Sequence, residues 1–288
     1  MEIDAVWRAD HPLPSVPEHT SKKSRGRVLV IGGAQRLPGA IRLTGEAALR
    51  VGAGRVRLAT LQSHAAMLGM FFPEAGIVGL PEQDGELMPG APGLLVEQAA
   101  AHDAVVLGPG MANKDAAARL VRELGRSPAA DTALLLDAAA VACAKPLCTP
   151  LRDYSGRLVL TPHAGEMAAL SGCSEEEVVA NAAAIARDVA ARFGAVVALK
   201  GPETVIASPA GGLLHFRSAC PGLGTAGSGD VLAGMIGGLL ARGADPLLAT
   251  AWGVWLHGEA GRACAARIAP IGFLARELLD EVPRLLPR

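Results

Sequence analysis

A glycine-rich loop that ends in an aspartate is the stretch of this sequence best suited to chemistry. The loop reads Gly222-Leu-Gly-Thr-Ala-Gly-Ser-Gly-Asp230 and runs directly into an apolar segment that predicts a buried helix. Glycines let a backbone approach a ligand closely, and the first turn of a helix carries unpaired N–H groups and partial positive charge. The loop therefore predicts an anion site, to which the hydroxyls of Thr225 and Ser228 can donate.

Asp230 itself has two interpretations. Aspartate is a favoured residue at a helix N-terminus and suits the helix dipole. Alternatively, a carboxylate beside an anion site acts as general base for a hydroxyl group held against a phosphate, which typically contributes a factor of roughly 10² to 10⁴. The motif alone leaves both open. The loop is not a P-loop, because the chain has no Gly-Lys-Ser or Gly-Lys-Thr, and it lies too late in the chain for a dinucleotide fingerprint.

Other polar or glycine-rich segments follow predicted strands. Lys200-Gly-Pro-Glu-Thr204 places a cation and a hydroxyl where they suit the phosphate or ribose of a nucleotide. Thr161-Pro-His-Ala-Gly-Glu166 is either a turn that begins a helix or a ligand contact through His163. Gly108-Pro-Gly110 is an ordinary turn or a close backbone approach, and Asp137 is either structural or a holder of magnesium-bound water.

The late pair His257 and Glu259 has the right residue types for a metal site but lacks a third partner. We interpret the pair as structural or interfacial, and we assign no residue as a metal ligand.

The elements that must position these residues alternate along the chain. Apolar runs bounded by glycine or polar residues predict strands at 28–31, 55–60, 104–107, 133–136, 158–160 and 195–199, followed by a hairpin of 204–207 and 213–216. Helical spacing predicts helices at 40–51, 246–267 and 273–285. This alternation predicts an α/β fold with a mainly parallel central sheet flanked by helices on both faces, and ligands bind outside the carboxyl ends of such strands.

Composition limits the function classes. The chain has 288 residues, of which 50% are hydrophobic and 3% aromatic, with a formal net charge of −1. This charge gives no case for binding nucleic acid or an anionic membrane, and no apolar run predicts a membrane span or signal peptide. Five cysteines without a Cys-x-x-Cys pair predict reduced thiols and a cytoplasmic location. We expect an irregular lead-in at residues 1–26 and a single domain at 27–288.

Taken in order, these stretches resemble the ADP-dependent NAD(P)H-hydrate dehydratases, which have a ribokinase-like fold. The matching segments span nearly the whole chain from Arg27 to Leu286. They are Gly32-Gly33 with Pro38-Gly39-Ala40, Ala48-Leu-Arg-Val-Gly-Ala-Gly54, Gly108-Pro-Gly110, Thr161-Pro-His-Ala-Gly-Glu166, Lys200-Gly-Pro-Glu-Thr204, Gly224-Thr-Ala-Gly-Ser-Gly-Asp-Val-Leu-Ala-Gly234 and His257-Gly258. The sequence departs from the family pattern at Ala34, at Met111-Ala112 and at Ala139-Ala140, where the family has serine, Leu-Gly and Asp-Gly.

The resemblance implies a repair lyase that dehydrates the S form of NAD(P)H hydrate at the expense of ADP, which becomes AMP and phosphate. It implies phosphoryl transfer to the ring hydroxyl, elimination of phosphate, and magnesium on the phosphates. The resemblance implies that Asp230 is the base and that the anion hole is formed by Gly227, Ser228 and Gly229. It implies that the hydrate site is lined by Ala40, Gly110, His163 and Asp230. It also implies that the nucleotide is contacted by Lys200, Gly201, Pro202, Glu203, Thr204 and Gly229.

The resemblance also implies a homo-oligomer, often a tetramer, and a separate NAD(P)H-hydrate epimerase in the same pathway. Two alternative functions remain. One is a ribokinase-like kinase of a thiazole or pyrimidine alcohol, which would release a stable phosphorylated product. The other is a catalytically silent nucleotide-binding protein, in which replacing Asp230 would leave function unchanged.

Overall fold

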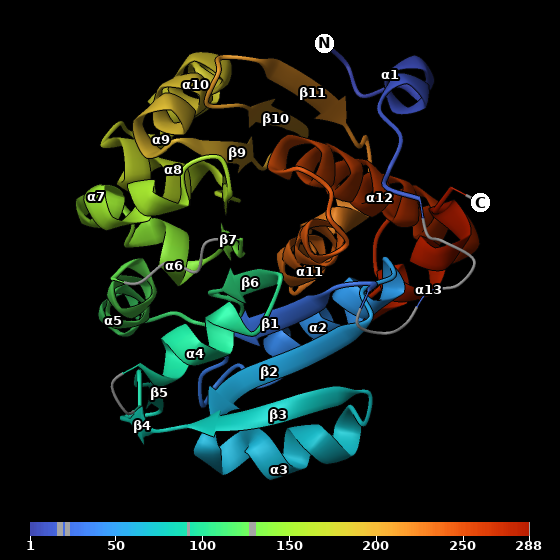
Figure 1. The fold of residues 1–288 in the computed structure, drawn as a ribbon. Helices are drawn as coiled ribbons and strands as arrows, with labels where there is room; N and C mark the ends of the chain where they lie inside the picture. The colour runs from blue at the N-terminus through green and yellow to red at the C-terminus, as the bar shows by residue number, and fades with distance from the viewer. Residues whose placement is uncertain (16–19, 21–23, 91–92, 127–130, 288) are drawn as a thin grey trace.

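The computed structural model of the chain describes residues 1–15, 20, 24–90, 93–126 and 131–287. Its centre is a nine-stranded sheet in the order β11-β10-β9-β8-β7-β6-β1-β2-β3 (Figure 1). The strands are β1 (Arg27–Ile31), β2 (Arg55–Leu61), β3 (Ala75–Leu80), β6 (Ala104–Leu107), β7 (Ala133–Leu136), β8 (Leu158–Leu160), β9 (Ala195–Leu199), β10 (Glu203–Ala207) and β11 (Leu213–Arg217). A separate two-stranded ribbon pairs β4 (Glu82–Gln83) with β5 (Glu86–Leu87).

The sheet is parallel from β3 through β9, and β10 runs antiparallel to both of its neighbours. In β1, Val28 and Val30 pack into one hydrophobic core while Leu29 and Ile31 pack into another, on the opposite face. A strand buried on both faces must be apolar at every position, which explains the unbroken apolar runs.

Two helical layers cover the sheet. One core is formed with α2 (Ala40–Arg50), α11 (Ser228–Ala241), α12 (Pro246–Arg267) and α13 (Ala275–Leu285), and the other with α4 (Leu94–Ala100), α5 (Lys114–Gly125), α8 (Ala164–Ser171) and α10 (Ala182–Phe193). The remaining helices are α1 (Ala5–Asp10), α3 (Gln62–Phe71), α6 (Ala139–Ala142), α7 (Cys148–Leu151), α9 (Glu175–Ala180), η1 (Lys145–Leu147), η2 (Arg152–Tyr154) and η3 (Pro221–Gly224). The predicted α/β fold, with helices on both faces of a mainly parallel sheet, is confirmed.

The segment expected to be an irregular lead-in contains the short helix α1. Its Asp4 side chain caps the helix by accepting from the Trp7 backbone amide at 2.8 Å. Trp7 is buried in the core, and the Arg8 guanidinium lies 3.9 Å from the ring centre of Trp255 in α12. Packing against α12 therefore orders part of this segment; residues 16–19 and 21–23 of it lie outside the described residues.

Within the described part of the chain, no helix is both long enough and apolar enough to cross a membrane. All five cysteines fall in that part, and each is a free thiol.

Candidate active site

The glycine loop leads into α11 through a backbone conformation that favours glycine. Gly227 is the N-cap residue with φ of 88°, and Ser228 begins the helix. Further along α11, a Cβ atom at Gly234 would lie 2.1 Å from the carbonyl oxygen of Thr44 in α2. The small residues after Asp230 therefore let α11 pack backbone-to-backbone on α2, which fixes the position of the N-terminus of α11.

Asp230 lies in the first turn of α11, three residues after the N-cap position. Its carboxyl group has a pKa raised from 3.8 to about 7, chiefly by burial and then by the negative charge of Asp137. The ammonium group of Lys200 and a hydrogen bond from the Gly110 backbone act in the opposite direction. A pKa near neutrality suits a group that takes up and releases a proton during turnover.

A largely buried ion pair lies next to Asp230. The Lys200 Nζ atom is 2.8 Å from Asp137 Oδ1, which also accepts a 2.7 Å hydrogen bond from Thr161 Oγ1. Glu166 Oε2 lies 3.8 Å from the same ammonium group. Burial alone would lower the pKa of Lys200, but the carboxylates of Asp137, Glu166 and Asp230 together raise it. Lys200 is therefore a fixed positive charge.

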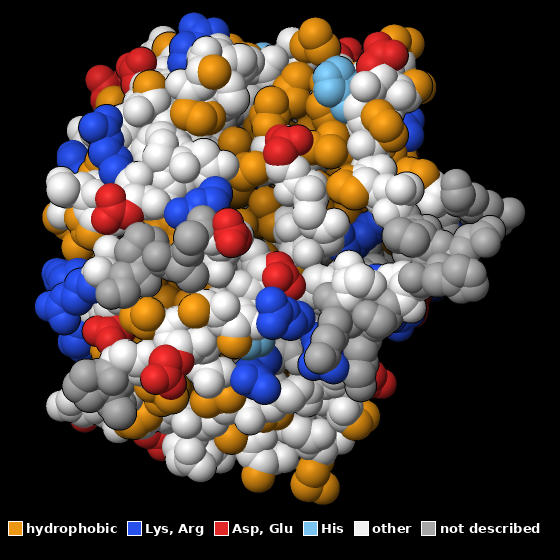
Figure 2. Space-filling view, viewed as in Figure 1, with side chains coloured by type: hydrophobic (Ala, Val, Ile, Leu, Met, Phe, Trp, Pro, Cys, Tyr) orange, Lys and Arg blue, Asp and Glu red, His pale blue; other side chains and the backbone are white. Residues whose placement is uncertain are grey.

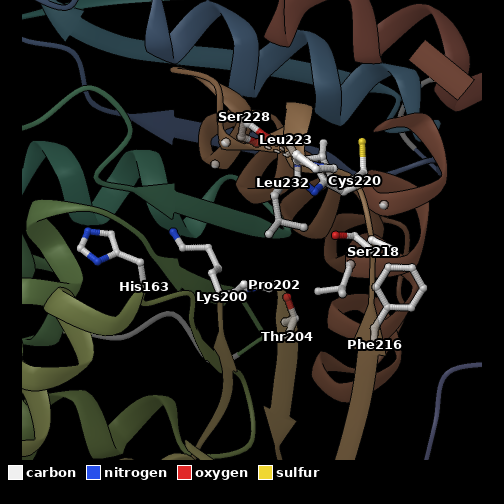
Figure 3. A pocket seen from close by; sticks show the side chains of 18 of the residues that line it. His163, Lys200, Pro202, Thr204, Phe216, Ser218, Cys220, Leu223, Ser228 and Leu232 are labelled. Atoms are coloured by element: carbon white, nitrogen blue, oxygen red, sulfur yellow. Dashed lines mark hydrogen bonds between the residues drawn. The ribbon is translucent and has the colours of Figure 1, made fainter. Parts of the chain in front are cut away.

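A cavity of about 830 Å³ opens beside this charge cluster (Figure 3). Four of the five residues in the predicted nucleotide motif at 200–204 line it: Lys200, Gly201, Pro202 and Thr204. Ser228 and Gly229, at the start of α11, line it as well, and a Cβ atom at Gly229 would lie 3.7 Å from Lys200 Nζ. One end of the cavity thus combines backbone amides with an ammonium group, which suits an anion.

The rest of the cavity wall is largely apolar. In the space-filling view, hydrophobic side chains gather in a hollow between β9–β11 and α12 (Figure 2). The apolar lining includes Phe216, Leu223, Leu232 and Val254. An apolar chamber that ends at a positively charged anion site fits a ligand with a flat base at one end and phosphates at the other.

Glu203 differs from its neighbours in the predicted nucleotide motif. Its carboxylate accepts from Arg217 at 3.1 Å and lies 2.9 Å from His215 Nδ1, both on β11. It does not appear among the described residues that line the cavity. The side chains alternate along β10, so Glu203 and Thr204 cannot face the same side.

The predicted hydrate-binding residues Ala40 and Gly110 lie together, outside the cavity wall. Gly110 has φ of 71°, and a Cβ atom there would lie 2.8 Å from both the Ala40 Cβ atom and the Leu37 carbonyl oxygen. The Gly110 backbone also donates to the Asp230 carboxylate, and Lys200 of the nucleotide motif acts on the same carboxylate through its charge. Asp230 therefore interacts both with the Gly110 backbone and with Lys200, which lines the cavity.

His163 is the N-cap residue of α8. Its Nδ1 atom accepts from the amides of Gly165 and Glu166, and Glu166 Oε2 accepts from the His163 amide at 2.8 Å. His163 is also among the residues that line the cavity. The structural interpretation of this residue is thus supported, and its predicted hydrate contact stays a prediction.

The site contains carboxylates but no preassembled metal cluster. No group of three or more histidine, cysteine, aspartate and glutamate side chains with metal-binding geometry occurs among the described residues. Magnesium commonly binds through one or two carboxylates, substrate phosphates and water. Asp137 and Glu166 fit that pattern, since the carboxylates of both lie within 4 Å of Lys200 Nζ and Lys200 lines the cavity.

Three residues that line the cavity carry no signal in the sequence: Ser218, Cys220 and Pro221, which lie between β11 and α11. Their types and spacing match no binding motif, so only the folded chain brings them to the site. His257 of α12 also lines the cavity, although the sequence assigned it a structural or interfacial role.

The family of this chain follows from its similarity to known proteins. A family model described as NAD(P)H-hydrate dehydratase matches residues 28–284. The chain belongs to this family. The predicted family membership is therefore confirmed, and with it the prediction of an enzyme. An ADP-dependent (S)-NAD(P)H-hydrate dehydratase from Xanthomonas campestris is 47% identical over 99% of this chain and 95% of the relative.

Solved structures agree with this family assignment. An ADP/ATP-dependent NAD(P)H-hydrate dehydratase from Bacillus subtilis, co-crystallised with ATP and Mg²⁺, superposes with a TM-score of 0.77, 28% identity and coverage of 94% of this chain and 92% of that one. A ribokinase-like superfamily protein from Enterococcus faecalis gives a TM-score of 0.80 and 27% identity, with 94% and 90% covered. The predicted ribokinase-like fold is confirmed. Further relatives named bifunctional NAD(P)H-hydrate repair enzymes are longer, and this chain spans about half the length of each.

Proposed function

We propose that this NAD(P)H-hydrate dehydratase family member converts the S form of hydrated NADH or NADPH back to the reduced cofactor and consumes ADP, which becomes AMP and phosphate. The observation that carries the proposal is the position of Asp230. Its carboxyl group, with a pKa raised to about 7, interacts both with Lys200, which lines the cavity, and with the backbone of Gly110, which lies against Ala40. Family membership and the Xanthomonas relative support the same reaction.

The nucleotide occupies the cavity in this proposal. The base packs in the apolar chamber near Phe216, and the phosphates lie at the anion end, against the Gly229 amide and the Lys200 ammonium group. Amides at a helix N-terminus need no reorganisation when negative charge develops during transfer, so they stabilise the transition state. Gly227 shapes this turn, and Ser228 adds a hydroxyl donor.

The hydrated nicotinamide ring lies on the other side, against Ala40 and Gly110. Its hydroxyl group gives its proton to Asp230 while the oxygen attacks the terminal phosphorus of ADP, and the bond to the bridging oxygen breaks to release AMP. The carbon–oxygen bond of the phosphorylated ring then breaks. Phosphate leaves with the electron pair and the neighbouring ring carbon loses a proton, so the double bond is restored and NAD(P)H forms.

Magnesium supplies charge neutralisation on the phosphates when it is bound. Asp137 and Glu166 are the side chains that would hold it, directly or through water. Lys200 compensates these carboxylates and keeps the pKa of Asp230 from rising further.

Recovery of the reduced-nicotinamide absorbance tests the proposal. Purified protein, hydrated NADH and magnesium should restore the absorbance when ADP is added, with one AMP formed for each NADH. No recovery with either ADP or ATP would refute it. Parallel assays with thiazole and pyrimidine alcohols test the kinase alternative, in which a phosphorylated alcohol accumulates, and nucleotide binding without any turnover would support the catalytically silent alternative.

Three further features stay proposals: a cytoplasmic location, a homotetramer, and a separate epimerase that supplies the S form. The five free thiols suit a reducing compartment. The longer bifunctional relatives support a functional link between this dehydratase domain and a second activity.

A further inference from the structure

His257 lines the nucleotide cavity but has no part in the mechanism above. It lies on α12, which packs against α11, and its Nε2 atom reaches the first residue of α11. That atom lies 2.8 Å from Ser228 Oγ and 3.1 Å from the Ser228 carbonyl oxygen. One nitrogen thus contacts both polar groups of a residue at the anion site.

The two contacts determine which nitrogen carries the hydrogen. A carbonyl oxygen can only accept, so the Nε2 atom that faces it must be a donor. Burial lowers the pKa of His257 to about 4, and the charge of Lys200 acts in the same direction. The ring is therefore neutral near pH 7, with its hydrogen on Nε2 and none on Nδ1.

This tautomer constrains the Ser228 hydroxyl. Because the hydroxyl oxygen faces an N–H group, it accepts from His257, and its own hydrogen must go to another acceptor. Without that contact, a serine in a helix commonly donates to a carbonyl of the preceding turn. Ser228 is only 3% exposed and lines the cavity, so little water competes with a bound phosphate for this hydrogen.

We infer that His257 is a positioning residue whose Nε2–H group holds the Ser228 hydroxyl oxygen and thereby directs the hydroxyl hydrogen to the phosphoryl group being transferred. This role rests on the proposed function, because the anion at Ser228 is the terminal phosphate of the nucleotide. It also gives α12 a part in catalysis, since His257 of this helix contacts the first residue of α11 at the anion site.

Two substitutions separate the hydrogen bond from the packing. His257→Leu removes the donor, whereas His257→Gln keeps an N–H group at the same distance from the main chain. We expect His257→Leu to lower kcat by roughly 10- to 100-fold, the cost typical of losing an orienting partner, with a smaller change in KM for ADP. His257→Gln should recover most of the loss. Leu256→Ala is the packing control in the same helix: it should lower the melting temperature and leave kcat unchanged.

A double-mutant cycle tests whether the effect passes through Ser228. In a Ser228→Ala background, His257→Leu should cost no more than about twofold in kcat, because the hydroxyl that it orients is gone. An equal cost in both backgrounds would overturn the inference, and so would failure of His257→Gln to recover activity while it retains the wild-type melting temperature.

A measurement without turnover separates this inference from the proposed reaction. Nitrogen-15 NMR of the histidine rings at pH 7.5 should show a neutral Nε2–H ring that disappears in His257→Gln. If hydrated NADH is not repaired but this signal is present, the proposed reaction fails while the hydrogen bond to Ser228 stands. A ring protonated on Nδ1, or on both nitrogens, would overturn the inference whatever the enzyme does.

Discussion

Asp230→Asn is expected to change activity and stability in opposite directions. Asparagine has nearly the same shape as aspartate, and its side-chain oxygen can still accept from the Gly110 backbone. It cannot take a proton from the ring hydroxyl. The substitution therefore removes the general base and, at the same time, a charge that is held in an unfavourable, largely buried place.

The loss of activity follows from the proton transfer. A positioned general base contributes a factor of roughly 10² to 10⁴, so kcat/KM should fall by about that factor. In the wild type, kcat/KM should fall about tenfold for each pH unit below pH 7, because protonated Asp230 is inactive. An aspartate with its ordinary pKa of 3.8 would place this bend about three pH units lower.

The gain in stability follows from the same pKa. A carboxyl group whose pKa is raised in the folded state favours folding only while it is protonated, so its contribution is present below pH 3.8 and is lost as the pH rises towards 7. A rise from 3.8 to about 7 corresponds to at most about 4 kcal/mol of destabilisation above pH 7. Asp230→Asn should recover part of this free energy at pH 8 and little of it at pH 4.

The assay measures both properties on the same preparations. Urea unfolding at pH 4 and pH 8 gives the free energy of unfolding, and absorbance recovery gives kcat/KM between pH 5 and pH 9. Asp188→Asn, at an exposed aspartate of α10, is the matched control and should change neither. Equal stability of Asp230→Asn and the wild type at pH 8, with no activity bend near pH 7, would refute the assigned environment of Asp230.

Three further substitutions test other parts of the site. Lys200→Met should lower the free energy of unfolding by about 3 kcal/mol, since it leaves the buried Asp137 carboxylate without its ion-pair partner. It should also move the acid-side bend in the pH profile of kcat/KM to higher pH, because the positive charge of Lys200 lowers the pKa of Asp230. An unchanged bend would contradict this coupling between Lys200 and Asp230. Gly110→Ala should abolish activity because its Cβ atom would clash at 2.8 Å, whereas Gly69→Ala, with only ordinary contacts, should be silent in the same assay. Thr204→Val should raise KM for ADP and Glu203→Gln should not, as titrations with ADP would show. The reverse result would contradict the assignment of Thr204, and not Glu203, to the cavity wall.

Much of the fold could be predicted because the buried strands are uninterrupted apolar runs. The strands at 104–107, 133–136, 158–160 and 195–199 match the structure at both ends. The edge strand β3 was not predicted, because Gly76 and Gly79 interrupt its apolar residues; among the described strands, only β2 pairs with it. Helix α1 was missed for a different reason: its order depends on Trp7 packing into a core that the local sequence does not reveal.

The site was predictable where one segment carries a complete signal. The loop that ends in Asp230 is such a segment, because its glycines and its aspartate are consecutive in sequence. The contact between Asp137 and Lys200 could not be predicted from a single segment. Asp137 follows β7 and Lys200 follows β9, and the order of strands in the sheet, with β8 between them, decides that these two ends lie close together. Glu203 was predicted to contact the nucleotide together with the rest of its motif. Alternation along β10 instead puts its side chain on the sheet face opposite that of Thr204, where it bonds to Arg217 of β11.

Transfer of the ring oxygen tests the central claim most directly. NADH hydrated in ¹⁸O-labelled water carries the label in its ring hydroxyl, and one turnover with unlabelled ADP follows in unlabelled water. Phosphoryl transfer to the ring hydroxyl followed by elimination predicts that the label leaves in phosphate, which mass spectrometry detects. Labelled water together with unlabelled phosphate would contradict the account, because ADP hydrolysis would then be separate from the loss of the hydroxyl group.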